Sequence, residues 1–180
     1  MARLPYIADS EAGSTELSAL YEDIRALRGS ILNLYRVLAN HPPALRAFMA
    51  MSHHVRDEST LPPQLRELAI LVTAHALDVE YEKVHHLPAA RRAGIPESKL
   101  QAVPRWATSP VYDPRERAVM AYADQVARTR RVSDSAFEAL RQHLTPAQIV
   151  DLAVTVGWYH FCAAIILPLE VETEHPGFTP

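Results

Sequence analysis

The sequence predicts an all-α protein of about eight helices. Only five of the 180 residues are glycine, whereas 48% are hydrophobic, with alanine and leucine common among them. Apolar side chains recur at helical spacing in successive segments, and no segment shows the alternation expected of a half-buried strand. A chain of this length can bury one sizeable core, so we expect a single domain over residues 1–180.

Capping residues and prolines divide the chain into its elements. The first helix begins at Ser14 or Thr15 and stops at Gly29, which makes residues 1–30 a peripheral helical element. The predicted helices cover residues 14–28, 31–40, 42–55, 63–77, 78–88, a short stretch within 95–106, 112–128, 133–143 and 145–167. The long apolar helix at the end is suited to packing between subunits, so we expect an oligomer.

The centre of the chain is a pair of helices that carries acid and base groups. Residues 68–77, LAILVTAHAL, are apolar almost all the way round a helix, which predicts a buried core helix. A second helix starts near Asp78, and its spacing places Val79, Glu82 and His86 on one face, where the last two can touch. Pro88 is expected to kink or end this helix.

Three side chains form the candidate acid and base group. Glu67 stands near the start of the core helix, and Glu82 and His86 lie on the next one. They favour either proton-transfer chemistry or a buried ion-pair network that ties two helices together, since both arrangements perturb charges. From the residues alone, the two interpretations have about equal weight.

The stretch 61–94 resembles a known family. Its pattern LPPQLRELAIL, followed by YE, His86, Ala90 and Gly94, is similar to the carboxymuconolactone decarboxylase family, which has the AhpD-like fold. The resemblance extends more weakly over about residues 33–172, which we take as the family core. It implies an AhpD-like helical bundle that assembles as a homotrimer or homohexamer.

The resemblance also says which branch of the family is involved. In the peroxidase branch, an upstream Glu, two Cys separated by two residues and a downstream His form a thiol redox centre. Here the Glu and His match Glu67 and His86, but Val79 and Glu82 occupy the two cysteine positions. Thiol peroxidase chemistry is thereby excluded, and the sequence resembles the decarboxylase branch. It departs from the family at Lys83, His160 and Pro168.

The resemblance implies a cofactor-free decarboxylase for a small carboxylated lactone or related oxo-acid. Such an enzyme must bind the carboxylate, delocalise the electrons left by carbon dioxide and protonate the resulting carbanion. His86 is the expected proton donor, Glu82 favours its charged form, and Glu67 orients the imidazole or holds a water. Arg91 and Arg92 are candidates for attracting the negatively charged substrate. Alternatives are another proton-transfer or addition reaction on a small acid, and a non-catalytic oligomeric binding protein.

A second group of residues is expected around this centre. It comprises candidates for the pocket lining or for supporting contacts, namely His75, Tyr81, His85, Trp158, Tyr159 and His160. Core packing is the more frequent role for buried histidine and aromatic side chains, so His75 is first of all expected to be a core residue. His85 lies one position away from the face of His86 and is expected to point toward another surface, such as a subunit contact.

Composition excludes several classes of function. The net charge is −3 and no basic tract is present, so nucleic acid is not an expected partner. No segment reads as a signal peptide or approaches a membrane span, which predicts a cytosolic protein. Cys162 is the only cysteine and is expected to be a packed, inert thiol. Glu82 and His85 have the E-x-x-H spacing of di-iron bundles, but no second copy exists, and we expect neither a metal nor another cofactor.

Overall fold

The prediction of an all-α fold is confirmed by the computed structural model, which describes residues 2–11 and 13–174. Over these ranges the chain forms nine α-helices and no strand. Their bounds are α1 Thr15–Arg28, α2 Asn33–Leu38, α3 Pro42–His53, α4 Pro63–Ala76, α5 Glu80–Arg92, α6 Glu97–Ala102, α7 Pro114–Thr129, α8 Asp134–Arg141 and α9 Pro146–Leu169. Short helical turns add Asp9–Glu11, His54–Glu58 and Val103–Arg105.

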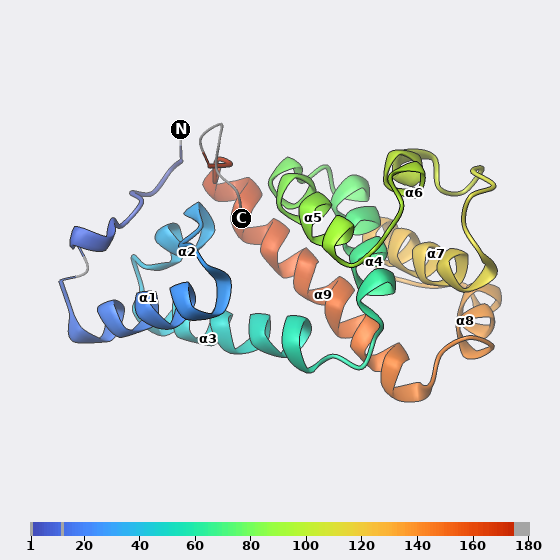
Figure 1. Cartoon of the computed structure of the whole chain (residues 1–180), viewed down its shortest axis with the longest axis horizontal. Coiled ribbons are helices and arrows are strands. Elements are labelled where there is room, and N and C mark those ends of the chain that lie inside the picture. Colours follow the sequence, from blue (N-terminus) through green and yellow to red (C-terminus); the bar gives the residue numbers. More distant parts are fainter. Residues whose placement is uncertain (1, 12, 175–180) are drawn as a thin grey trace.

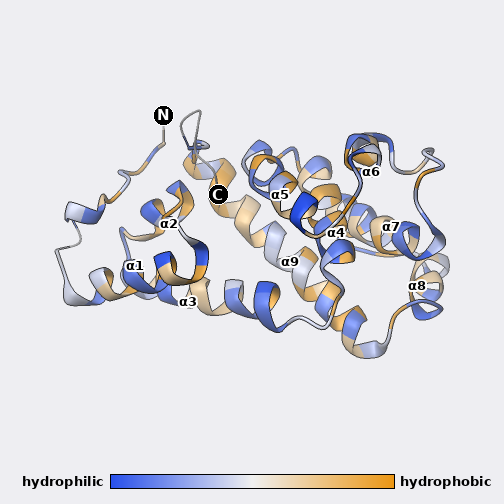
Figure 2. Ribbon diagram, in the orientation of Figure 1, coloured by the Kyte–Doolittle hydropathy of each residue, from blue (hydrophilic) through white to orange (hydrophobic). Residues whose placement is uncertain are grey.

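The helices form two groups joined by α9. Figure 1 shows α1, α2 and α3 at one end and α4 to α8 toward the other, with α9 running diagonally between them. The buried apolar side chains form two clusters, one mainly of α1–α3 that also includes Ile70 and Tyr81, and one of α4–α8. α9 contributes Leu152 and Val156 to one cluster and Cys162 and Ile166 to the other, so this helix holds both groups together. The hydropathy colours of Figure 2 show many hydrophobic residues along α9.

The prediction of a buried core helix is confirmed by α4. All seven residues from Leu68 to Ala74 are buried, and α4 packs against α5, α7 and α9. A helix that is apolar on every side has to be covered on every side, which explains its central place. Glu67 lies in the second turn of α4, so the core itself positions this carboxyl group.

Several predicted caps are present. Ser14 accepts a hydrogen bond from the backbone N–H of Leu17, and Gly29 ends α1 with a φ of 79°, a backbone conformation that glycine adopts without strain. Asp113 and Thr145 form capping boxes at the starts of α7 and α9.

The start of α5 agrees with the prediction, but its end does not. The helix begins at Glu80, two residues after Asp78, whose φ of 53° lies in the left-handed region. Pro88 does not end it, and α5 continues to Arg92. Pro88 removes one backbone donor, but the next turn remains bonded, with the N–H of Ala93 donating to the carbonyl of Ala89.

The expectation that no segment approaches a membrane span also needs correction. α9 is long and apolar enough to cross a membrane by length and composition, with a mean hydropathy of 1.7 in an 18-residue window. In this fold α9 packs against α4, α7 and α8. The core helix of a globular bundle has the same composition, because it too must be covered.

Candidate active site

A hydrogen-bonded chain of three side chains joins α4, α5 and α9. The carboxylate of Glu67 accepts a hydrogen bond from Nδ1 of His86 at 2.7 Å, and Nε2 of His86 lies 2.8 Å from the hydroxyl of Tyr159. Glu67 is 5% exposed and His86 1%. A carboxylate only accepts, so the neutral ring carries its proton on Nδ1, and its Nε2 accepts from Tyr159. The structure therefore brings together Glu67 and His86, as predicted.

Two further side chains contact the same imidazole. Glu82 Oε2 lies 3.5 Å from Nε2 of His86, one helical turn earlier on α5, which confirms that the two side chains touch. Arg56 Nη2 lies 3.4 Å from the same nitrogen. The imidazole is thus surrounded by two carboxyl groups, a guanidinium and a phenol, all of which can exchange or stabilise a proton.

The pKa values of the two glutamates are shifted in opposite directions. Burial raises the pKa of Glu82, and the nearby His86 and Arg56 offset this only in part. Burial also acts to raise the pKa of Glu67, but the charge and hydrogen bond of His86, together with Arg56, lower it below its ordinary value. Paired carboxyl groups with divergent pKa values are typical of acid and base partners. Glu67 is the ionised partner and Glu82 the one that more readily keeps a proton.

Arg56 was missed by the sequence analysis. It lies on a π-helical turn, His54–Glu58, that continues α3 beyond the predicted end of the helix. His53 Nδ1 lies 2.9 Å from Asp57, and His54 Nδ1 lies 3.1 Å from Glu58. These i,i+4 pairs could have indicated that the helix continues past His54. His53 is the last residue of α3 and His54 the first of the turn, and both pair with carboxylates of the turn.

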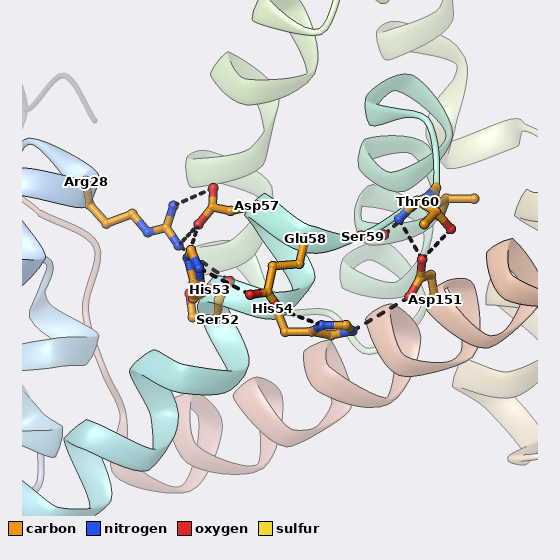
Figure 3. A network of polar contacts seen from close by, with 10 residues as sticks. Arg28, Ser52, His53, His54, Asp57, Glu58, Ser59, Thr60 and Asp151 are labelled. Carbon is orange, nitrogen blue, oxygen red and sulfur yellow. Dashed lines mark hydrogen bonds and ion pairs between the residues drawn. The ribbon is translucent and has the colours of Figure 1, made fainter.

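Neighbouring elements hold this turn on both sides (Figure 3). Arg28 of α1 makes an ion pair with Asp57 at 3.0 Å. On the other side, Asp151 of α9 accepts hydrogen bonds of 2.6 Å from the backbone N–H and the hydroxyl of Thr60. His54 Nε2 lies 3.7 Å from the same carboxyl group. Arg56 is thus carried by a segment that is fixed at both ends.

His85 lies in a different environment from His86. Its ring stacks on Tyr81, and its Nε2 lies 2.6 Å from the carboxylate of Glu174. Tyr81 also donates to Glu174, at 3.0 Å. His85 therefore points away from the partners of His86, as predicted, and the segment after α9 buries it. The sequence could not show that the chain returns to cover it.

Of the other predicted pocket residues, Trp158 lines a small cavity together with Glu82 and Tyr159, whereas His75 and His160 do not. His75 is exposed at the end of α4, so the expectation of a core histidine was wrong. His160 is half-buried, and burial and the charge of Arg130 lower its pKa. Trp158 packs against Phe48 and Phe161 and lines an apolar groove of about 590 Å³ between α3 and α9.

Two spaces adjoin the network, one on each side. Toward Tyr159 and Glu82 lies a cavity of about 20 Å³, room for about one water molecule. On the side of Glu67, a more open pocket of about 330 Å³ lies at the surface. Arg56 lines both spaces and separates them.

No thiol or metal chemistry is built into the described part of the chain. Cys162 is buried, and burial raises the pKa of its thiol well above the ordinary value. No group of three or more His, Cys, Asp or Glu side chains among residues 2–11 and 13–174 has the geometry to hold a metal ion.

Residues 42–125 match the carboxymuconolactone decarboxylase family. This span contains Arg56, Glu67, Glu82 and His86, so the resemblance identified from the sequence is confirmed for the segment that carries most of the network. None of the curated proteins matches the chain.

Solved structures with an AhpD-like fold cover most of the chain. A protein of unknown function from Agrobacterium tumefaciens, described as a putative antioxidant defence protein AhpD, is 25% identical with a TM-score of 0.72, over 77% of this chain and 96% of its own. An uncharacterized peroxidase-related protein from Ralstonia eutropha JMP134 is 21% identical with a TM-score of 0.82, over 96% and 92%. A variant of the debrominase Bmp8 in complex with 2,3,4-tribromopyrrole is 17% identical with a TM-score of 0.82, over 97% and 94%. The last two show the fold alone.

Proposed function

We propose that this chain, with its AhpD-like fold and carboxymuconolactone decarboxylase segment, is a cofactor-free decarboxylase of a small carboxylated lactone or related oxo-acid. The observation that carries the proposal is the buried hydrogen bond of 2.7 Å between Glu67 and His86. It fixes the orientation of an imidazole, a group that can donate or accept a proton. The opposite pKa shifts of Glu67 and Glu82 support the same interpretation.

The reaction needs one proton and one electron sink. The bond between the carboxylate carbon and its neighbour breaks, carbon dioxide leaves, and the electron pair delocalises into the adjacent carbonyl or lactone. His86 supplies the proton that restores the carbon–hydrogen bond, and a proton from water recharges the imidazole. Glu67 holds the imidazolium in place and, because it lines the larger pocket, relays its proton toward the substrate. Arg56 stabilises the negative charge that develops beside this network.

The test is carbon dioxide release from 4-carboxymuconolactone and a panel of related lactone and oxo-acids. We expect His86→Ala to reduce kcat by about 10²- to 10⁴-fold, the usual contribution of a positioned acid or base. Glu82→Gln should also reduce kcat while the oligomeric size stays unchanged. His75→Ala is the matched control, because this exposed histidine lies outside the network. No turnover by the wild type on any compound would refute the decarboxylase proposal.

A second candidate function is a non-catalytic oligomeric binding protein. The observation that favours it is the cavity of about 20 Å³ beside Tyr159, which shows how tightly the network is packed. In that case His86→Ala would lower stability without removing any activity.

A third candidate is another proton-transfer reaction on a small acid, which the same panel would detect through a product other than carbon dioxide. Under all three we propose a cytosolic homo-oligomer, which size-exclusion chromatography with light scattering would test.

A further inference from the structure

The open pocket beside Glu67 is lined mainly by arginine. It lies where the end of α1, the π-helical turn, the start of α4 and the end of α5 meet, and encloses about 330 Å³. Four guanidinium groups and two carboxylates face it, namely Arg28, Arg56, Arg66, Arg92, Asp57 and Glu67. Its volume is at the lower end of the range of small-molecule sites.

Both carboxylates of this pocket already have hydrogen-bond partners. Asp57 accepts hydrogen bonds from Arg28 and His53, and Glu67 accepts one from His86. Four positive charges therefore face only two negative ones, and the excess is not balanced from within the pocket. A site of this charge attracts a small anion.

Three of the arginines have N–H groups without a partner, among them Arg28, whose Nε is buried. Nε of Arg66 is buried without a hydrogen-bond partner, and its nearest ion-pair partner, Glu67 Oε1, lies 3.7 Å away. Arg92 makes no hydrogen bond or ion pair with any residue in the described ranges. A buried guanidinium N–H without a partner costs free energy, which a bound acceptor would recover.

Arg91 and Arg92, the two arginines predicted to attract the substrate, have different surroundings in the structure. Arg91 is committed to Glu97, with Nε and Nη2 donating at 3.0 and 3.1 Å, and does not line the pocket. Arg92 lines the pocket. Only one of these neighbours can therefore serve an anion that also contacts Arg66.

We infer that this pocket binds the carboxylate of a small organic acid through Arg66 and Arg92, next to Glu67. The planar guanidinium matches a carboxylate with two parallel hydrogen bonds, which fixes the orientation of the acid as well as its position. The inference deepens the proposed function, since it assigns the place where the substrate's carboxylate is held. Arg66 and Arg92 then act as substrate-binding residues, and Glu67 contacts the reacting part of the molecule.

Direct binding tests the pocket without any assumption about the reaction. Malonate and succinate are titrated into the full-length protein by isothermal titration calorimetry at low salt, with inorganic phosphate as a second arm. We expect saturable binding of a dicarboxylate that weakens as salt is added. Arg92→Gln and Arg66→Gln should each weaken it about tenfold, and Arg91→Gln should leave it unchanged. Arg92→Gln carries the test if Arg66→Gln disturbs folding, because Arg92 is exposed.

Three outcomes would overturn the inference. They are no saturable binding of either dicarboxylate, tighter binding of phosphate than of both, and an equal loss in Arg91→Gln and Arg92→Gln. The carbon dioxide assay separates this result from the proposed function. If dicarboxylates bind through Arg92 but no compound releases carbon dioxide, the pocket stands and the decarboxylase proposal falls. If turnover is found and Arg92→Gln leaves KM unchanged, the reaction stands and the pocket assignment falls.

Discussion

The two sides of the His86 imidazole differ in almost every physical property. On the Nδ1 side, Glu67 leads to an open pocket of about 330 Å³ lined by arginines. On the Nε2 side, Tyr159 and Glu82 border a cavity of about 20 Å³. One ring thus connects a hydrated cationic surface with the apolar interior.

This difference explains why two chemically identical carboxyl groups have opposite pKa shifts. Both are 5% exposed, so burial alone cannot distinguish them. Glu67 has a direct hydrogen bond of 2.7 Å to His86 and an ion pair with Arg66, whereas the only contact of Glu82 with the imidazole is 3.5 Å long. Close cationic partners decide which carboxyl group is ionised.

The largest predicted effect concerns Arg56, the residue that lies between the two sides. Replacement by Met removes the buried guanidinium whose charge acts on both Glu67 and Glu82. We expect Arg56→Met to lower the free energy of unfolding by about 3 kcal/mol, as for other ion pairs broken in a protein interior. Urea denaturation measures this loss.

The matched control is Arg128→Met. Arg128 pairs with Asp124 at 2.9 Å on the surface of α7, with 60% of its side chain exposed. Such pairs contribute about 0–1 kcal/mol, so this variant should remain close to the wild type. Equal losses in the two variants would show that Arg56 does not balance the buried carboxylates.

The second prediction separates the two glutamates by pH. The pKa of Glu67 is lowered by folding, so its stabilising effect is present above its ordinary value of 4.5 and is lost as the pH falls through the lowered value. The pKa of Glu82 is raised, so its contribution is full below 4.5 and is lost as the pH rises through the raised value. At pH 8 we expect Glu67→Gln to lose about 2 kcal/mol, because a charged hydrogen bond is removed. Glu82→Gln should be more stable than the wild type.

Thermal unfolding between pH 4 and pH 8 measures both effects. The loss of stability in Glu67→Gln relative to the wild type should be constant from pH 5 to pH 8. The gain of stability in Glu82→Gln should increase over the same interval. Glu80→Gln on the same helix is the control for Glu82→Gln, since Glu80 is exposed, and its curve should parallel that of the wild type. If Glu82→Gln were less stable than the wild type at every pH, the conclusion that burial of the charged Glu82 carboxylate lowers stability would be wrong.

The local parts of the site could be predicted from the sequence. Glu82 and His86 touch because they are one turn apart on a helix, and helical spacing is a property of the sequence. The buried character of α4 was likewise evident from its continuous apolar run. Glu67 could be assigned to the site only through the family resemblance, because the family pattern links it to His86 on the next helix, which helical spacing alone cannot do.

The side-chain contacts that depend on tertiary packing could not be predicted, although Tyr159 itself was among the expected pocket residues. Arg56 and Tyr159 lie 30 and 73 positions from His86, and only the folded chain brings them to its Nε2. His75 was wrongly predicted to lie in the core. In a helix that is apolar all round, the sequence does not indicate which residue at the end faces solvent. The burial of His85 could not be predicted either, because the segment that buries it begins only after α9 ends.

The smallest predicted effect tests whether the Nε2 side of His86, with its small cavity, is independent of the Nδ1 side, with its open pocket. Tyr159→Phe removes the hydroxyl that lies 2.8 Å from Nε2 of His86, and no other described group lies as close to that nitrogen. The buried acceptor is left poorly satisfied, so we expect a loss of about 1 kcal/mol in the free energy of unfolding. Tyr122→Phe is the control, because the Tyr122 hydroxyl has no hydrogen-bond partner in the described ranges, and it should change little.

Dicarboxylate binding by the same variant sharpens the comparison. Because Tyr159 lines the small cavity and not the arginine pocket, Tyr159→Phe should bind malonate and succinate as the wild type does. Arg92→Gln should show the opposite pattern, with weaker binding and nearly unchanged stability, because its side chain is exposed. A loss of binding in Tyr159→Phe as large as that in Arg92→Gln would mean that the imidazole transmits changes from one side to the other. The two sides would then form one site rather than two.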